Sequence, residues 1–129
     1  MTTTSEKNSQ STVTPIGEAQ QKQVIQQTRY FIRRGGELYR QQFDETPIYF
    51  DLKGRTAGMY KVVGRGRRAQ RLIRYNPWIF AKYYDENLKV TVPHEVAHYL
   101  VDCLYGLRRV RPHGAEWKSV MDAFGVDSS

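Results

Sequence analysis

The sequence has little of several residues on which small proteins often depend. It contains one cysteine, Cys103, in 129 residues. A single cysteine excludes an intrachain disulfide and a cysteine-rich zinc ribbon, and it suits a reducing compartment. No apolar run is long enough to cross a bilayer, and the Ser/Thr/Gln-rich start lacks the apolar centre of a secretory signal. We therefore expect a protein of the cytoplasm, or one associated with the nucleoid, with no membrane partner.

The hydrophobic pattern predicts helices at both ends of the chain and strands between them. Residues 1–17 are small and polar, which predicts a disordered tail before one folded domain over 18–129. A first helix is expected over 18–34, interrupted by Gly35-Gly36 and resumed over 37–43. A meander of three strands is expected over 47–52, 57–63 and 70–75. Further helices are expected over 77–84, 90–105 and 115–124. This order predicts an α+β fold with a small three-stranded sheet and flanking helices.

Acidic residues are scarce relative to basic ones. The chain carries 20 Lys and Arg against 13 Asp and Glu, a formal charge of +7. This excess favours contact with nucleic acid or acidic proteins, although many small domains are equally basic for solubility. Five arginines gather on the predicted hairpin: Arg65, Arg67, Arg68, Arg71 and Arg74. They could follow the phosphates of a nucleic acid or protect an edge strand from aggregation, and both interpretations stay open.

Histidine is equally scarce, and its placement is informative. All three histidines fall in one window of 20 residues, and two form the sequence His94-Glu95-Val96-Ala97-His98. On a helix these two side chains project from one face, about 6 Å apart along the axis. Both imidazoles can then bind one zinc ion, and Glu95 between them can take a proton from a water on the metal. The spacing predicts the active site of a zinc hydrolase.

A catalytic zinc normally has three protein ligands and one open position. Asp102 continues the i+4 series, but it lies about 12 Å from His94 along a helix axis, so we reject it as a ligand. His113 follows the motif after a connection of 14 residues, long enough to turn back to the site, and Glu116 follows soon after. We prefer His113 because imidazole is the commoner zinc ligand. Glu116 stays open as the alternative.

Residues around the motif allow further predictions. Trp117 is expected to pack beneath the third ligand rather than to contact substrate, and Cys103 is expected to be a small buried hydrophobe. Three carboxylates could orient a ligand imidazole by hydrogen-bonding to it, and solvated or structural roles stay equally open for them: Asp102, Glu116 and Asp122. No histidine remains to stabilise an oxyanion, so a tyrosine, an arginine or the metal alone must do so, and the candidate side chains are Tyr105, Arg108 and Arg111.

These segments are similar to those of a known family. The segments 92–100 and 112–117 strongly resemble the SprT-like zinc metalloproteases, and 50–58 and 73–77 resemble that family's sheet. The likeness covers roughly residues 20–125. It implies a zincin-like fold, with the sheet packed on the active-site helix, zinc bound by His94, His98 and His113, and Glu95 as the catalytic acid and base. Eukaryotic members degrade proteins crosslinked to DNA.

Two hypotheses of different classes result. The first is a zinc-dependent endopeptidase, assumed monomeric, whose protein substrate lies extended along the sheet edge and whose further partner is DNA. The second is a nucleic-acid-associated binding module whose zinc is mainly structural. Many family members carry a Cys-rich zinc ribbon, and this sequence has only Cys103. We therefore do not expect the residues of this sequence to bind DNA through such a ribbon.

Overall fold

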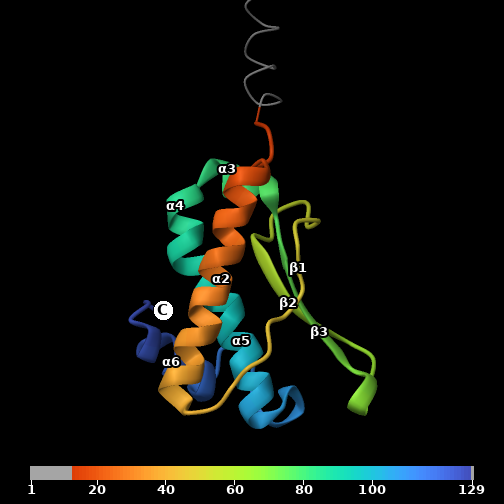
Figure 1. Cartoon of the computed structure of the whole chain (residues 1–129), viewed down its shortest axis with the longest axis vertical. Helices are drawn as coiled ribbons and strands as arrows, with labels where there is room; N and C mark the ends of the chain where they lie inside the picture. Colours follow the sequence, from red (N-terminus) through yellow and green to blue (C-terminus); the bar gives the residue numbers. More distant parts are fainter. Residues whose placement is uncertain (1–12, 129) are drawn as a thin grey trace, which may run out of the picture.

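Two long helices, α2 (Glu18–Tyr39) and α5 (Val92–Tyr105), pack on each other beside a small sheet (Figure 1). The computed structural model describes residues 13–128. The shorter helices are α3 (Pro77–Lys82), α4 (Tyr84–Glu86) and α6 (Ala115–Phe124), with single turns at η1 (Gly66–Arg68), η2 (Asn87–Thr91) and η3 (Leu107–Arg109). Helices line one side of the sheet, and α6 packs on both α2 and α5. The predicted α+β class is confirmed.

The continuity of α2 corrects two expectations. Gly35-Gly36 does not interrupt the helix, and no separate helix forms over 37–43, because α2 continues to Tyr39 and the chain leaves it at Arg40 in the left-handed conformation (φ 53°). Gly35 faces α5, where an added Cβ would lie 2.3 Å from Cδ1 of Leu100. The absence of a side chain at Gly35 therefore permits a close approach of the two long helices at this point.

The sheet differs from the predicted meander. Its strands are β1 (Ile48–Tyr49), β2 (Gly58–Val63) and β3 (Gln70–Tyr75), in the order β1-β3-β2, with β1 parallel and β2 antiparallel to β3. The expected strand over 47–52 is reduced to two residues, although the chain still follows β3 as far as Leu52, whose N–H donates to the carbonyl of Tyr75 at 3.2 Å. β3 is the central strand and is paired on both sides, so β2 is an edge strand that lies beside α5.

The core lies between the sheet and the long helices, and it fixes the position of α5. The largest fully buried apolar side chains come from α2, β3, α3, α5 and α6, among them Val24, Ile73, Tyr75, Phe80, Leu100 and Met121. The hydroxyl of Tyr75 is paired with Oγ1 of Thr28 at 2.8 Å. Burial of these side chains supplies most of the stability that holds α5 against β2.

The π-helical turn η2 leads directly into α5. Helical structure therefore begins before residue 90, where the sequence predicted the start of this helix. Pro93 lies in the first turn of α5, as predicted. Proline lacks the N–H that would reach back to an earlier carbonyl, and a wider π turn accommodates that loss. Asn87 anchors the turn, since its amide donates to the Tyr83 carbonyl at 2.9 Å and its Oδ1 accepts from Thr91 at 2.5 Å. The expected helix over 77–84 ends early, at Lys82.

The folded part of the chain begins before Glu18. Residues 1–12 of the expected tail lie outside the described residues. Ile16, however, is 3% exposed, and its N–H donates to the carbonyl of Pro77 at 3.1 Å. The end of the expected tail is therefore part of the core. Within residues 13–128, no helix combines the length and apolar character needed to span a membrane.

Candidate metal centre

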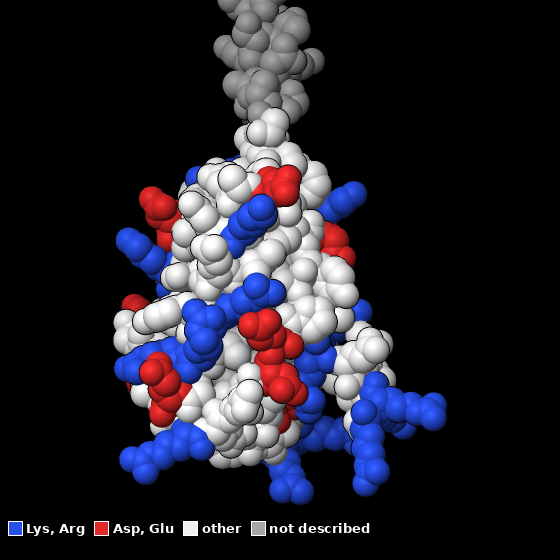
Figure 2. All heavy atoms as spheres, in the orientation of Figure 1, with Lys and Arg blue, Asp and Glu red and all other residues white. Residues whose placement is uncertain are grey.

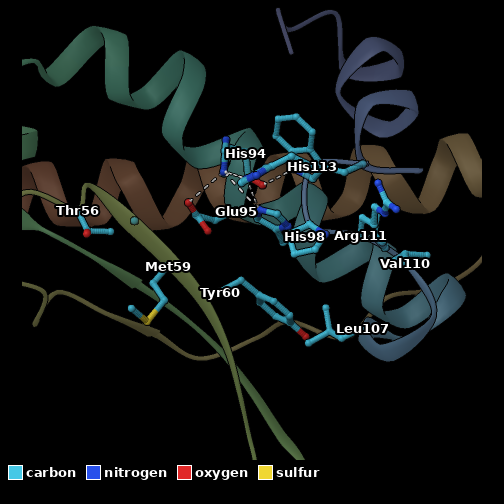
Figure 3. A pocket seen from close by; sticks show the side chains of 14 residues that line it. Thr56, Met59, Tyr60, His94, Glu95, His98, Leu107, Val110, Arg111 and His113 are labelled. Atoms are coloured by element: carbon cyan, nitrogen blue, oxygen red, sulfur yellow. Dashed lines mark hydrogen bonds and ion pairs between the residues drawn. The ribbon is translucent and has the colours of Figure 1, made fainter. Parts of the chain in front are cut away.

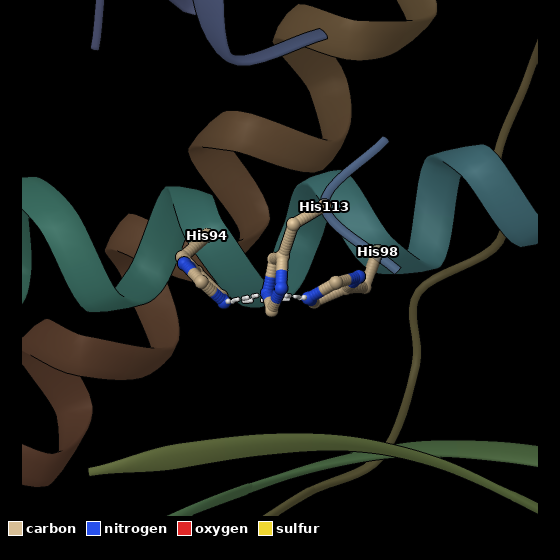
Figure 4. A group of neighbouring side chains, drawn as sticks. All are labelled: His94, His98 and His113. Carbon is tan, nitrogen blue, oxygen red and sulfur yellow. Dashed lines mark hydrogen bonds between the residues drawn. The ribbon is translucent and has the colours of Figure 1, made fainter. Parts of the chain in front are cut away.

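The three histidines meet at one point in space (Figure 4). Helix α5 presents His94 and His98 from one face, and the loop before α6 brings His113 back to them. The Nε2 atoms lie 3.3 Å apart for His94 and His98, and His113 places its own Nε2 3.0 Å from each. The preferred third residue is therefore in the cluster. Glu116, the alternative, is not one of its members.

The chemistry of the three nitrogens fits a metal ion. A neutral imidazole nitrogen either donates a proton or offers a lone pair, and it cannot do both. In a triangle of three Nε2 atoms at least one pair must therefore oppose two protons or two lone pairs. A cation that accepts all three lone pairs removes this conflict. A tetrahedral ion with bonds of about 2.0–2.1 Å needs nitrogens roughly 3.3 Å apart, close to the observed separations.

His113 occupies its place through an unusual backbone conformation. Its φ is 58°, in the left-handed region where residues other than glycine are uncommon and tend to mark functional sites. The next residue, Gly114, is equally constrained, since an added Cβ would lie 3.0 Å from the carbonyl oxygen of Arg111. Helix α6 then begins at Ala115. The tight turn directs the imidazole back toward α5.

Trp117 supports the cluster from beneath, as predicted. The side chain is 4% exposed, and its Nε1–H donates to the backbone carbonyl of His94 at 3.2 Å. Its ring centroid lies 4.8 Å from that of His94, 5.6 Å from His98 and 4.7 Å from His113. One buried indole thus contacts all three imidazoles and joins α6 to the helix that carries two of them.

Burial keeps the helical histidines in the form that binds metals. Loss of solvent lowers the pKa of His94 to about 4, and the neighbouring His113 lowers it further. Burial lowers the pKa of His98 to about 3, with added repulsion from both other imidazoles. Both rings are therefore neutral near pH 7, and each has a lone pair to give.

Glu95 lies beside the cluster, at the edge of the sheet (Figure 3). Its side chain is 6% exposed, and Oε2 is 3.9 Å from Nε2 of His94. Burial raises the pKa of this carboxyl to about 8, while a hydrogen bond from the backbone N–H of Tyr60 lowers it. A carboxyl held beside a metal site with a pKa near neutrality is suited to moving a proton.

Gly58 at the start of β2 makes room for Glu95, and the sequence did not single it out. An added Cβ would lie 2.9 Å from Cγ and 3.1 Å from Oε2 of Glu95, and 2.9 Å from Cγ2 of Thr91. A glycine inside a predicted strand is the signal that could have found it, because it often marks a close backbone approach. Strand β2 and helix α5 are therefore in close contact at Gly58.

Asp102 is not among the residues that converge on the cluster, and of the roles left open for it the structure shows a structural one rather than contact with an imidazole. It is 8% exposed and accepts from the hydroxyl of Tyr60 at 2.6 Å and from Nε of Arg71 at 2.8 Å. Its other oxygen accepts from the backbone N–H of Leu107 at 3.3 Å. In the described part of the chain, Glu116 and Asp122 do not hydrogen-bond to an imidazole either. Cys103 is partly rather than fully buried.

The five hairpin arginines divide into two groups. Arg71 pairs with Asp102, and Arg74 pairs with Asp51 at 2.7 Å. The other three are exposed at the turn between β2 and β3, where Figure 2 shows basic side chains projecting at the lower right: Arg65, Arg67 and Arg68. Within residues 13–128, no carboxylate forms an ion pair with these three. Contact of the arginines with nucleic acid stays a prediction.

A pocket of about 410 Å³ opens over the three histidines. One wall is β2, with Gly58 and Tyr60, and the opposite wall is the loop that leads to His113 (Figure 3). Of the three residues considered for an oxyanion, Arg111 lines this pocket, whereas Tyr105 and Arg108 do not. The pocket is thus large enough for part of a substrate and open at the metal site.

Comparison with known proteins agrees with this geometry. The model of the SprT-like family matches residues 28–128. Protein SprT of Pseudomonas paraeruginosa is 33% identical over 89 residues, which cover 69% of this chain and 50% of that protein. Protein SprT of Vibrio parahaemolyticus is 34% identical over 94 residues, which cover 72% of this chain and 52% of that protein. The chain spans about half the length of these relatives. No solved structure gives a significant match. The family model covers most of the chain, which therefore belongs to the SprT-like family.

Proposed function

We propose that the protein is a zinc-dependent endopeptidase. The observation that carries this proposal is the Nε2 triangle of His94, His98 and His113 with the Glu95 carboxyl beside it. Three imidazoles with an open fourth position are a typical catalytic zinc site. Zinc bound there supplies Lewis-acid activation of a water molecule and of a substrate carbonyl. Glu95 takes the proton of the attacking water and delivers it to the leaving amine.

The edge strand β2 is suited to hold a substrate in extended form. Asn76 N–H donates to the carbonyl of Ala57 at 2.9 Å, and hydrogen-bonded pairs alternate along an antiparallel ladder. The backbone groups of Gly58, Tyr60 and Val62 therefore point away from β3. An extended peptide can pair with such an edge, and the Tyr60 N–H already lies at Glu95. The substrate we propose is a locally unfolded protein segment.

The proposal is tested by incubating the zinc-loaded chain with one protein in its folded and its unfolded form. We expect cleavage of the unfolded form, and mass spectrometry of new N-termini should find internal peptide bonds broken. The folded form should be cleaved only in exposed loops, because strand pairing needs an extended segment. Absence of cleavage in both forms would contradict endopeptidase activity.

Substitution Gly58→Ala is expected to displace Glu95 without removing the metal. The added methyl group overlaps Cγ of Glu95, and misplacement of a catalytic group by about 1 Å can cost roughly 100-fold in rate. We expect kcat/KM to fall by about that factor at unchanged zinc content. Gly17→Ala is the control, because no atom lies within 4 Å of its added Cβ. Normal activity in Gly58→Ala would show that Glu95 does not need its present position.

We propose as a second candidate function binding to nucleic acid, which the three exposed arginines at the β2–β3 turn favour: Arg65, Arg67 and Arg68. Each phosphate contact contributes about 0.7–0.9 to the slope of log affinity against log salt. We expect the triple reversal of Arg65, Arg67 and Arg68 to glutamate to reduce that slope by roughly 2 to 3 for single- or double-stranded DNA.

The matched control reverses three exposed lysines away from this turn: Lys22, Lys82 and Lys89. Both triple variants have the same net charge. An equal loss of DNA binding in the two variants would mean that overall charge, and not this turn, attracts the nucleic acid. DNA binding by a chain that cleaves no protein would favour the binding module over the peptidase.

A further inference from the structure

The pocket continues past His98, on the side away from Glu95, into an apolar recess (Figure 3). We define the recess by Tyr60 of β2, Val101 of α5, and Leu107 and Val110 of the following loop. Val101 lies three residues after His98 and shares its helix face. The recess is therefore continuous with the proposed catalytic site, and it is built from three separate segments of the chain.

The recess is apolar and partly open. Val101 is 3% exposed and forms a buried surface next to His98, whereas Leu107 is 44% exposed. A large apolar side chain exposed at the mouth of a pocket is typical of a binding surface. The one charged side chain near the recess that lines the pocket is Arg111. A charged ligand group entering this recess would lose water, and the nearby carboxylate of Asp102 is already paired with Arg71.

Asp102 holds two walls of the recess in place. One carboxylate oxygen accepts from the Tyr60 hydroxyl at 2.6 Å, and the other accepts from the Leu107 N–H at 3.3 Å. Arg71 holds the same carboxylate from β3 at 2.8 Å. Because Asp102 belongs to α5, both walls are tied to the helix that carries His94 and His98. The recess is thus preformed, which lowers the entropy cost of filling it.

We propose that this recess selects a medium-sized apolar side chain, such as Leu, Val, Met or Phe, next to the scissile bond. The inference rests on the proposed peptidase function and adds its specificity. A peptide paired with β2 turns alternate side chains to opposite sides, so one of them meets the recess when the peptide backbone lies at Glu95 and His98. Apolar contact there stabilises the bound peptide, and Arg111 repels lysine and arginine.

The test maps cleavage sites in a mixture of unfolded proteins and then measures two matched peptides. The peptides differ only in Leu or Ala at the position where the map shows enrichment. We expect the wild-type chain to favour the Leu peptide roughly 10-fold in kcat/KM. Leu107→Asp should remove that preference, measured as the ratio of kcat/KM for the Leu peptide to kcat/KM for the Ala peptide in the same variant. Leu107→Ala, which adds no charge, should reduce the preference in part. Tyr83→Asp changes another exposed residue and should keep it.

The outcomes separate the two proposals. Cleavage without an apolar preference would overturn the recess as a specificity site and leave the peptidase intact. A preference that persists in both Leu107 variants would overturn it as well. No cleavage by the wild-type chain, with zinc bound, would contradict the peptidase and with it this inference.

Discussion

Replacing Glu95 with glutamine is expected to lower kcat by roughly 10²- to 10⁴-fold, the usual contribution of a general base, with bound zinc unchanged. Glutamine has nearly the same shape, so the packing against Gly58 and the hydrogen bond from the Tyr60 N–H survive. It cannot accept the proton of an attacking water. Since the three imidazoles do not depend on this carboxyl, the metal should stay in place.

The measurement compares single-turnover cleavage and zinc content in the same preparation. Glu86→Gln is the matched control, because Glu86 is exposed on α4 and does not line the pocket. We expect that variant to behave like the wild type. Full activity in Glu95→Gln would exclude the proposed role of Glu95. Loss of zinc from the same variant would instead assign the carboxyl to metal binding.

Replacing His113 with alanine is expected to remove the metal. The remaining pair, His94 and His98, offers two nitrogens 3.3 Å apart, and a catalytic zinc site normally has three protein ligands. Loss of a residue that only hydrogen-bonds to a metal ligand already lowers metal affinity by about 10- to 100-fold. Loss of a ligand that binds the metal directly should lower it further. We expect zinc affinity to fall by well over 100-fold, and chelator competition measures it.

Glu116 provides the decisive comparison for His113. Glu116→Gln should keep zinc, because Glu116 is not among the residues that converge on the site. If His113→Ala kept its zinc while Glu116→Gln lost it, the third ligand would be Glu116. Circular dichroism should show both variants folded, since His113 is exposed and Glu116 is only partly buried on α6.

The site could be predicted from the sequence to the extent that it depends on local geometry. The i, i+4 spacing placed His94 and His98 on one helix face, and the rise of a helix excluded Asp102 as their co-ligand. His113 was predicted from the type of side chain that zinc prefers. Its left-handed backbone (φ 58°), which makes the return possible, has no comparable signal in the sequence.

What could not be predicted depends on contacts between distant segments. In the order β1-β3-β2 the central strand β3 pairs with two other strands, and hydrophobic alternation in the sequence does not show which strands pair. Gly35 suggested a helix break, yet Leu100 fills the space above it. Asp102 and Arg71 are 31 residues apart and pair only once the sheet lies on α5. The grouping of arginines in the sequence therefore does not show which of them are paired with carboxylates in the fold.

The most direct test of zinc-dependent cleavage is a titration of metal-free protein with zinc, with bound metal and peptide cleavage measured at each step. We expect no cleavage without metal, and a rise in activity that stops at one equivalent of zinc. In His113→Ala the same titration should restore no activity at one equivalent. Cleavage by the metal-free chain, or an inactive wild-type chain with one zinc bound, would contradict the proposed function.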